Sequence, residues 1–325
     1  MTEQPEYQIV HLDRATIGPE IDLHKPQTAH HWTSYDRTAE DEVITRLKDA
    51  DIAVLNKVAI TKAHLEQLPG LKMIVLSATG YDKIDIAECK RRNIVVSNIR
   101  GYARQTVPEH TLCLILALRR SLKGYMADVQ QGEWQKSGQF CFFNHPIADL
   151  KGSRLGLIGS GSIGAEVGRL ATAFGMVVMR AERKGADQPR PGFHLFEEVL
   201  QQADILSLHC PLTPDTTHLI AAAEMQQMKP TSLLINTSRG GLVNEADLIT
   251  ALDKGWIAGA GFDVLTQEPP ASDHILMRHA HRPNLIITPH VAWTSDEAMQ
   301  SLWDQLISHI DAFAAGTPQN NLCAE

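Results

Sequence analysis

The sequence is poor in cysteine, and its cysteines form no pair of the C-x-x-C type. Five of them are scattered along 325 residues, at Cys89, Cys113, Cys141, Cys210 and Cys323. Disulfide-stabilised secreted domains carry an even, dense set of cysteines, and structural zinc sites use closely spaced pairs. An odd and scattered set fits free thiols in a reducing compartment better, so we expect a cytoplasmic protein.

Long apolar runs and blocks of basic residues are also missing. The longest apolar run, Thr111 to Leu118, ends at Arg119 and is far shorter than the roughly 18 residues of a membrane span. The stretch from Met1 to Glu6 is polar and acidic, so we expect no secretory signal. The formal net charge is −8 without a lysine or arginine cluster, which argues against nucleic acid as a partner. We therefore expect binding to neither membranes nor nucleic acids.

Histidine patterns suited to a metal are lacking too. His30 and His31 are adjacent, and His279 and His281 are two residues apart. Neither pair has the helical i, i+4 spacing or the additional ligands that a metal site needs. We expect no metal.

What is present is enough chain for two domains. At 325 residues and 43% hydrophobic composition, the sequence can form two cored domains of about 150 residues each. Short aliphatic runs alternate with helical patterns from the start, which predicts parallel sheets in an α/β fold. The first group of expected strands is Ile52 to Leu55, Met73 to Leu76 and Ile94 to Val96, with helical stretches near Asp41 to Lys48, His64 to Leu68 and Ile84 to Arg92.

A second unit follows a long helical pattern from Val107 to about Gln131 and a loop from Gly132 to Leu150. Its six expected strands are Arg154 to Ile158, Met176 to Ala181, Ile205 to Leu208, Leu233 to Asn236, Ala258 to Phe262 and Leu285 to Thr288. Six strands with helices between them predict a doubly wound sheet.

The last amphipathic pattern, from Trp293 to about Ala315, is a single helix that cannot form a domain alone. Because chain ends commonly lie close together, we expect this helix to pack on the first unit. The first domain is then discontinuous, at 1–100 and 292–325, and the second, at 101–291, is an insertion.

A glycine motif follows the first strand of the second unit. Gly159, Gly161 and Gly164 form G-x-G-x-x-G between that strand and a helix. The first glycine permits a tight turn, the second lets a pyrophosphate approach the backbone, and the third allows close packing of helix and strand. Glu182 ends the next strand, where an acidic residue accepts hydrogen bonds from the adenosine ribose and favours NAD over NADP. Arg183 and Lys184 come next, and they leave contact with a 2′-phosphate open.

Arg239, Glu268 and His290 follow three later strands of the same unit. Because the carboxyl ends of parallel strands meet at one edge of a sheet, we expect these side chains to converge. Reduction of a 2-oxo acid needs a cation for the carboxylate and carbonyl, a proton donor for the developing alkoxide, and a partner for that donor. Arg239, His290 and Glu268 supply these groups in that order, because a carboxylate beside an imidazole stabilises its charged form.

At this point the chain resembles the D-isomer-specific 2-hydroxyacid dehydrogenases over almost its whole length. The resemblance rests on G-S-G-S-I-G at 159–164, N-T-S-R-G at 236–240, F-D-V-x-x-x-E-P at 262–269 and T-P-H at 288–290. It implies an NAD-binding Rossmann domain inserted in a discontinuous flavodoxin-like substrate domain, with the active site in the cleft between them. It also implies that Arg239 binds substrate, that His290 is the acid/base and that Glu268 is its partner.

The resemblance further implies which other residues line the cofactor and the substrate. The positions that match cofactor contacts are Thr106, Ser162, Ile163, Cys210, Pro211, Thr216, Thr237 and Asp263, with Asp263 facing the nicotinamide carboxamide. The segment with Thr79 and Gly80 matches the loop whose N–H groups hold the substrate carboxylate, and Asn56 lies in a second matching segment. Relatives commonly have aspartate where this chain has Glu182, which departs from the pattern.

Within the family, the segments around Asn56, Thr79 and P-H-V-A-W at 289–293 are similar to glycerate dehydrogenases, also called hydroxypyruvate reductases. Glyoxylate reductase or D-lactate dehydrogenase activity is the alternative within this chemistry. An NADH-sensing scaffold like the corepressors that share the fold is the alternative outside it. The apolar segment Gln139 to Phe143 predicts an interface, and the resemblance implies a twofold homodimer through this region. The alternative is that this segment packs on its own NAD-binding domain.

Overall fold

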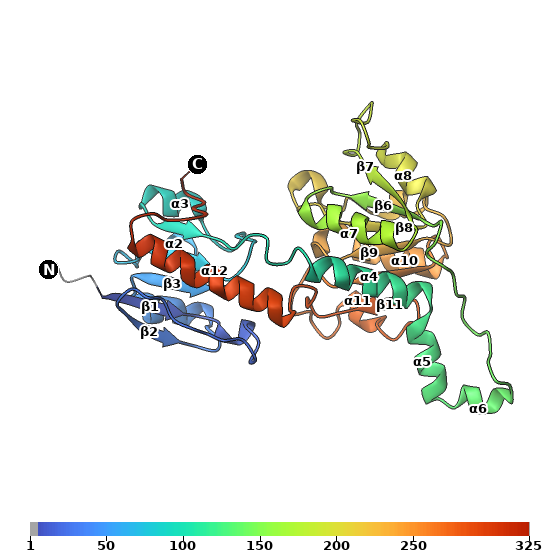
Figure 1. Cartoon of the computed structure of the whole chain (residues 1–325), viewed down its shortest axis with the longest axis horizontal. Helices are drawn as coiled ribbons and strands as arrows, with labels where there is room; N and C mark the ends of the chain where they lie inside the picture. The colour runs from blue at the N-terminus through green and yellow to red at the C-terminus, as the bar shows by residue number, and fades with distance from the viewer. Residues whose placement is uncertain (1–5, 325) are drawn as a thin grey trace. The chain divides into compact units, whose positions relative to one another are not determined.

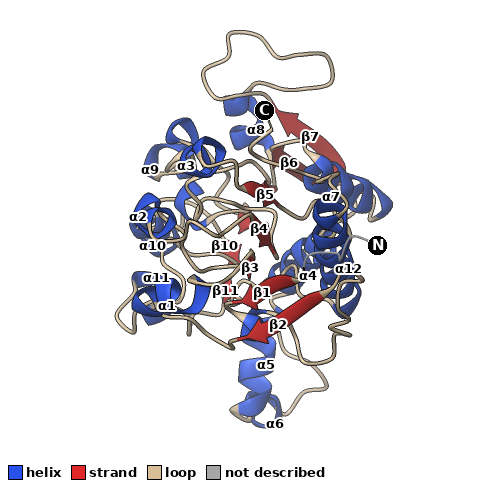
Figure 2. Cartoon of the chain, turned by 90° about the vertical axis from the view of Figure 1, so that its left-hand side faces the viewer, coloured by secondary structure: helices blue, strands red, loops and turns tan. Residues whose placement is uncertain are grey.

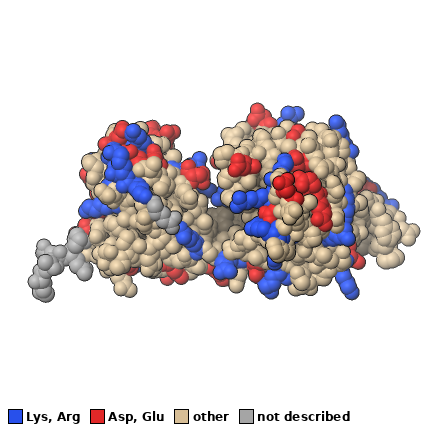
Figure 3. Space-filling view, turned by 90° about the horizontal axis from the view of Figure 1, so that it is seen from above, with Lys and Arg blue, Asp and Glu red and all other residues tan. Residues whose placement is uncertain are grey.

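The computed structural model describes residues 6–324, so part of the segment inspected for a secretory signal lies outside it. The chain divides into two compact units, Met1–Ala103 with Thr294–Glu325, and Arg104–Trp293 (Figure 1). We describe each unit by itself. In the part of the chain that is described, no helix combines the length and apolarity needed to cross a membrane. Basic and acidic side chains are interspersed on the face of each unit drawn in Figure 3.

The first unit is a five-stranded parallel sheet in the order β2-β1-β3-β4-β5, the flavodoxin-like order that the resemblance implied. Its strands are β1 (Tyr7–His11), β2 (His30–Ser34), β3 (Ile52–Leu55), β4 (Met73–Leu76) and β5 (Val95–Ser97). Its helices are α1 (Val43–Leu47), α2 (Lys62–Glu66), α3 (Ile86–Arg91) and α12 (Asp296–Ala314). Figure 2 shows α12 on one face of this sheet and α1, α2 and α3 on the other.

The final helix belongs to the first unit. It begins at Asp296 because the Ser295 side chain caps it, accepting a hydrogen bond from the Ala298 backbone N–H at 3.3 Å. Leu302, Trp303 and other residues at helical spacing are buried. The Trp303 indole N–H donates to the His24 carbonyl at 3.0 Å, which ties the end of the chain to its beginning.

The second unit is a six-stranded parallel sheet in the order β11-β10-β9-β8-β6-β7. Its strands are β6 (Arg154–Ile158), β7 (Val177–Ala181), β8 (Ile205–Leu208), β9 (Leu233–Asn236), β10 (Gly259–Phe262) and β11 (Leu285–Ile287). Its helices are α4 (Thr106–Arg119), α5 (Leu122–Gln130), α6 (Glu133–Ser137), α7 (Ser162–Ala173), α8 (Phe196–Gln202), α9 (Ala222–Met225), α10 (Glu245–Asp253) and α11 (Ile275–Arg278).

This sheet has a hydrophobic core on each face. Leu233 and Ile235 of β9 pack with residues of α4 and α7, whereas Leu234 between them packs with residues of α8 to α11. Burial on both faces explains why these strands are almost continuous apolar runs in the sequence. Such runs are the clearest strand signal, and all six strands were predicted with bounds that differ by one residue or less.

One helical prediction was wrong. The pattern from Val107 to about Gln131 forms two helices, because the chain turns at Ser121, which adopts a left-handed conformation with φ 48°. The segment beyond, expected to be a loop, contains the short helix α6. In Figure 1, α5 and α6 reach away from the sheet of the second unit, and the extended segment after them returns to it. We call residues 122–147 the arm.

Candidate active site

The glycine loop lies where the strand order of the second unit reverses. The chain runs from β6 to β7 on one side of β6 and then returns to β8 on the other side. In doubly wound sheets, the carboxyl end of the strand at such a reversal is where dinucleotides bind. Here that end is Gly159, with φ 95°, followed by Gly161 and the start of α7.

The packing around these glycines fits a bound dinucleotide. A Cβ at Gly159 would lie 2.5 Å from the carbonyl of His209, and one at Gly164 would lie 2.2 Å from the oxygen of Gly159. A Cβ at Gly161, by contrast, would have no described atom within 4 Å. The first and third glycines are therefore required by close packing, and the second leaves an open approach to the N-terminus of α7, where N–H groups favour phosphates.

The remaining residues predicted to line the cofactor lie around this loop in the second unit. Ser162 and Ile163 begin α7, while Cys210 and Pro211 follow β8 and Thr237 follows β9. The Thr237 hydroxyl is 2.9 Å from that of Thr111 on α4, and the Thr216 hydroxyl donates to the Pro211 carbonyl at 2.7 Å. The Thr106 hydroxyl donates to the Ala292 carbonyl at 3.0 Å. These contacts connect the loops, but the role of each residue toward a cofactor stays a prediction.

Glu182 directly follows β7, and its carboxylate forms hydrogen bonds with the chain itself. Arg190 donates to it from its side chain, with Nε at 2.5 Å from Oε2 and Nη2 at 2.9 Å from Oε1. The backbone N–H of Arg183 donates to Oε1 at 2.9 Å. The Arg190 side chain, followed by the Arg183 backbone, lowers the pKa of Glu182 to about 2. Glu182 is therefore a charged residue that anchors the loop after β7.

His290 is held in an unusual conformation against a carboxylate. Its backbone has φ 55°, a left-handed value that costs energy in a residue other than glycine. Its Nδ1 lies 2.6 Å from Oε2 of Glu268, and both side chains are about one-third exposed, at 28% and 31%. Glu268 therefore fixes the orientation of the ring through Nδ1, and a role of Nε2 in proton transfer stays a prediction.

Asp263 anchors the segment that carries His290. Its carboxylate is 1% exposed and accepts hydrogen bonds from the Thr288 hydroxyl at 2.5 Å and from the backbone N–H groups of Val291 and Ala292. The His290 N–H donates to the Asp263 carbonyl at 2.8 Å. These hydrogen bonds hold the backbone at His290 in place, so its strained conformation persists in the folded protein. Sequence reasoning placed Asp263 beside the nicotinamide and did not anticipate this anchoring role.

A second His–carboxylate pair supports the loop that carries Glu268. Glu245, the first residue of α10, accepts from the Thr266 N–H at 2.9 Å and the Thr266 hydroxyl at 2.7 Å. His274 Nε2 lies 3.1 Å from the same carboxylate, and both side chains are largely buried. The adjacent N–H of Leu265 donates to Glu268 Oε1 at 2.9 Å. Sequence reasoning missed Glu245 and His274, because neither lies in a motif with chemical meaning.

Arg239 is exposed directly after β9 and donates from Nη1 to the Ser238 carbonyl at 2.8 Å. Gly240 beside it has no room for a side chain, because a Cβ would lie 2.0 Å from the Leu265 carbonyl carbon. The Arg239 turn therefore packs directly on the loop that leads to Glu268. Since β9, β10 and β11 are neighbours, the three predicted catalytic residues follow adjacent strands at one edge of the sheet.

The predicted substrate residues of the first unit follow β3 and β4. Asn56 is buried, and its N–H donates to the buried carboxylate of Asp13, which also accepts from the Lys57 N–H at 2.7 Å. Thr79 is exposed, and its hydroxyl donates to the Ile99 carbonyl at 2.7 Å. Gly80 follows it. Their contact with a substrate is not tested by these bonds and stays a prediction.

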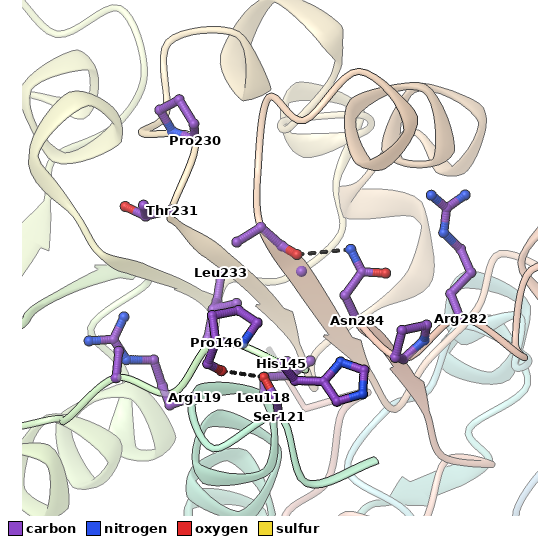
Figure 4. Close-up of a pocket in the computed structure, with 14 residues that line it drawn as sticks. Leu118, Arg119, Ser121, His145, Pro146, Pro230, Thr231, Leu233, Arg282 and Asn284 are labelled. Atoms are coloured by element: carbon purple, nitrogen blue, oxygen red, sulfur yellow. Dashed lines mark hydrogen bonds between the residues drawn. The ribbon is translucent and has the colours of Figure 1, made fainter. Parts of the chain in front are cut away.

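A cavity of about 570 Å³ lies at the opposite, amino-terminal edge of the second sheet (Figure 4). Leu233 and Gly259, the first residues of β9 and β10, line it together with Pro146 and Pro283. No residue predicted to act in catalysis or cofactor binding lines it. The cavity is therefore separate from the predicted catalytic and cofactor-binding residues.

The fold and the glycine loop together define an NAD-dependent dehydrogenase. Residues 112–292 match the family model described as D-isomer specific 2-hydroxyacid dehydrogenase, NAD binding domain. The chain is 47% identical to a glycerate dehydrogenase of Methylorubrum extorquens, over 96% of this chain and 98% of that protein. It is 45% identical to a putative 2-hydroxyacid dehydrogenase of Haemophilus influenzae, over 94% and 98%. The chain belongs to the D-isomer-specific 2-hydroxyacid dehydrogenase family.

Solved structures support the same fold over the whole length. A putative D-3-phosphoglycerate dehydrogenase from Ralstonia solanacearum superimposes with a TM-score of 0.81 at 28% identity, covering 98% of this chain and 97% of that one. An acyclic imino acid reductase solved with NADPH and D-Arg gives 0.79 at 29% identity, covering 97% and 99%. The predicted fold class, two parallel-sheet α/β units with an NAD-binding Rossmann fold, is confirmed.

Proposed function

We propose that this protein reduces hydroxypyruvate to D-glycerate with NADH, as a glycerate dehydrogenase. The observation that carries the proposal is the 2.6 Å contact between His290 and Glu268 on a backbone held by Asp263. That contact prepares a proton donor at the edge of the sheet where the glycine loop lies. The glycerate dehydrogenase and the hydroxypyruvate reductase of Blautia hydrogenotrophica, at 47% and 32% identity, support this choice of substrate.

The proposed mechanism assigns one role to each of three side chains. Bound NADH supplies a hydride to C2 of the 2-oxo acid. His290 delivers a proton from Nε2 to the carbonyl oxygen as the alkoxide develops, and Glu268 stabilises the charged imidazole before the transfer. Arg239 binds the carboxylate and polarises the carbonyl. Reversal of these steps oxidises the 2-hydroxy acid, with His290 as the base.

We assign the cofactor to the second unit and the rest of the substrate site to the first. The glycine loop with Ser162 and Ile163 would hold the pyrophosphate, because N–H groups at the start of α7 favour anions. We assign Glu182 to the adenosine ribose position. The other residues assigned to the cofactor are Thr106, Cys210, Pro211, Thr216, Thr237 and Asp263. We assign Asn56, Thr79 and Gly80 to the substrate.

A steady-state assay with a panel of 2-oxo acids tests the proposal. We expect the highest kcat/KM with hydroxypyruvate when NADH oxidation is followed with hydroxypyruvate, glyoxylate, pyruvate and 3-phosphohydroxypyruvate. A higher value with glyoxylate or pyruvate would reassign the protein to glyoxylate reductase or D-lactate dehydrogenase. No oxidation of NADH with any of them, despite NADH binding, would favour the scaffold alternative.

We also propose a homodimer that forms through the arm. Phe140 and Phe143 are each 88% exposed, and Trp134 and Ile147 are about half exposed. Apolar side chains gathered on one projecting segment are typical of an interface, and a twofold axis would bury the same surface of both subunits. The five free cysteines suit a reducing environment, and this supports a cytoplasmic location.

A further inference from the structure

The carboxylate of Glu182 has no acceptor position left for a ligand. A carboxylate offers about four lone-pair positions. Oε1 accepts from Arg183 N and Arg190 Nη2, both at 2.9 Å, and Oε2 accepts from Arg190 Nε at 2.5 Å and Arg190 N at 3.2 Å. Four donors from the chain therefore occupy four positions. A ribose hydroxyl can bind Glu182 only if one of these bonds breaks.

Arg190 is held in this position by more than the ion pair. Two backbone hydrogen bonds close the loop from Arg183 to Phe193 at its base. The His194 N–H donates to the Arg180 carbonyl, and the Glu182 N–H donates to the His194 carbonyl, both at 2.8 Å. The Arg190 guanidinium also lies 4.3 Å from the ring centroid of Phe193. The loop therefore returns Arg190 to the end of β7 by backbone pairing, ring contact and a bidentate ion pair.

The carboxylate at the end of β7 is therefore neutralised by a cation, and the loop 183–193 carries three basic residues against one acidic residue, Asp187. Arg190 neutralises Glu182, and the exposed Arg183 adds a second cation next to the pair. Lys184 is drawn away from it, because its Nζ lies 2.8 Å from Glu224. An uncompensated carboxylate here would accept both ribose hydroxyls and repel a 2′-phosphate. A neutralised carboxylate with two guanidinium groups does neither, and guanidinium groups suit phosphate oxygens.

We propose that this end of the nucleotide site accepts a 2′-phosphate, so that the enzyme binds NADPH as well as NADH, and that Arg190 determines this dual choice. The inference rests on the nucleotide site proposed above. Arg190 acts in two ways: it removes the negative charge that would exclude the phosphate, and it places its own guanidinium beside it. Glu182, which sequence reasoning took as the residue that selects NAD, is the anchor for that arginine.

Equilibrium binding of the two reduced coenzymes tests the wild-type protein without any substrate. Dissociation constants are measured by energy transfer from tryptophan to NADH or NADPH. We expect the two constants to agree within about tenfold, because Arg190 neutralises the Glu182 carboxylate that would otherwise repel the phosphate. A larger preference for NADH would overturn the proposal. Added salt should weaken NADPH binding more steeply than NADH binding, because only NADPH carries the 2′-phosphate.

The variant Arg190→Gln tests the role of the residue itself. Loss of the guanidinium frees the Glu182 carboxylate, so the ratio of the NADPH to the NADH dissociation constant should rise about tenfold or more. Arg154→Gln is the matched control: it removes one exposed positive charge at the opposite edge of the same sheet and should leave the ratio unchanged. An unchanged ratio in Arg190→Gln, in a variant that still binds NADH, would contradict the proposal. If that variant does not fold, the salt dependence of coenzyme binding to the wild type tests the proposal instead. Equal salt dependence of NADPH and NADH binding would contradict the proposal.

This experiment separates the inference from the proposed function. Coenzyme affinities do not depend on which 2-oxo acid is reduced, so failure of the hydroxypyruvate assay leaves them valid. A protein that reduces hydroxypyruvate but binds NADPH far more weakly than NADH would keep the proposed function and lose the inference. A protein that binds neither coenzyme would lose both.

Discussion

At the residue scale, His290 combines a strained backbone with a short contact to Glu268. We predict that His290→Ala lowers kcat about 10²- to 10⁴-fold with a much smaller change in KM, because the imidazole acts on the transition state. Steady-state kinetics with hydroxypyruvate and NADH measure both constants. Unchanged turnover in this variant would remove His290 from the mechanism.

Arg239 should behave differently from His290. Because it binds the carboxylate in the ground state as well as in the transition state, we predict that Arg239→Ala mainly raises KM for the 2-oxo acid. The dissociation constant for NADH should stay as in the wild type. The same assay checks this, and an unchanged KM with lowered kcat would show that Arg239 acts on the carbonyl in the transition state and does not bind the carboxylate in the ground state.

His11 in the first unit gives a prediction about pH. Its ring is fully buried against Trp32 and Trp303, and among the described residues neither ring nitrogen has a hydrogen-bond partner, although Nε2 lies 3.9 Å from Oδ1 of Asp13. Burial first, then Lys25 and Arg14, lower its pKa from 6.5 to about 3. The unfolded chain therefore binds a proton below pH 6.5 that the folded chain does not. The contribution of His11 to stability is full above pH 6.5 and falls as the pH drops toward 3.

We predict that His11→Phe makes stability less dependent on pH. Between pH 7.5 and 5.5, the wild type should lose about 1.4 kcal/mol more unfolding free energy than the variant. Urea unfolding at the two pH values measures this difference. At pH 7.5 the variant should be at least as stable, because phenylalanine removes two unsatisfied polar atoms from an aromatic cluster. Equal pH dependence of the two proteins would show that His11 is not the titrating group.

The site residues differ in how far the sequence reveals them. Arg239, Glu268 and His290 were predicted as a set, because they follow three neighbouring strands after a nucleotide-binding motif, whereas each alone has an ordinary structural explanation. Glu182 was placed correctly at the end of β7, but its partner Arg190 is eight residues away in a loop without a pattern. The anchoring of His290 by Asp263 depends on backbone N–H directions, which no sequence pattern specifies.

At the element scale, two carboxylates, those of Glu245 and Glu268, accept hydrogen bonds from the loop that runs from Leu265 to Glu268. Glu245 holds the Thr266 N–H and Glu268 accepts the Leu265 N–H, so two adjacent peptide groups fix the loop. We predict that Glu245→Gln lowers kcat by loosening Glu268 and leaves the NADH dissociation constant unchanged. A double-mutant cycle with Glu268→Gln measures the coupling.

In that cycle, the loss caused by Glu245→Gln should be much smaller in the Glu268→Gln background than in the wild type, because Glu245 acts through Glu268. Glu245→Asp, which keeps the charge, should restore part of the activity. Equal losses in the two backgrounds would show that Glu245 supports the fold independently of Glu268.

The elements themselves were predictable to different degrees. Fully buried strands such as β8 and β9 were found because both of their faces are apolar. The sequence reading missed both β1 and β2. For β2 the reason is that it is an edge strand of mostly exposed histidine, threonine and serine. The break between α4 and α5 was missed because Ser121 adopts a left-handed conformation with neither glycine nor proline to mark it.

At the scale of the whole molecule, the arm predicts the oligomeric state. We expect the wild type to have the mass of a dimer at micromolar concentration in analytical ultracentrifugation. The double variant Phe140→Asp and Phe143→Asp should be monomeric, because both side chains are exposed in the single chain and would be buried in the dimer. Phe174→Asp, on a half-exposed phenylalanine outside the arm, is the control and should remain a dimer. A wild-type monomer at all concentrations would exclude the arm as an interface.

The central claim is that His290, whose charged form Glu268 stabilises, protonates the carbonyl oxygen of a 2-oxo acid while NADH is oxidised. The rate of NADH oxidation with saturating hydroxypyruvate, compared between wild type and His290→Ala, tests it most directly. The account predicts rapid oxidation by the wild type and a loss of about a hundredfold or more in the variant. A wild type that binds NADH but does not oxidise it, or a variant that matches the wild type, would contradict the account.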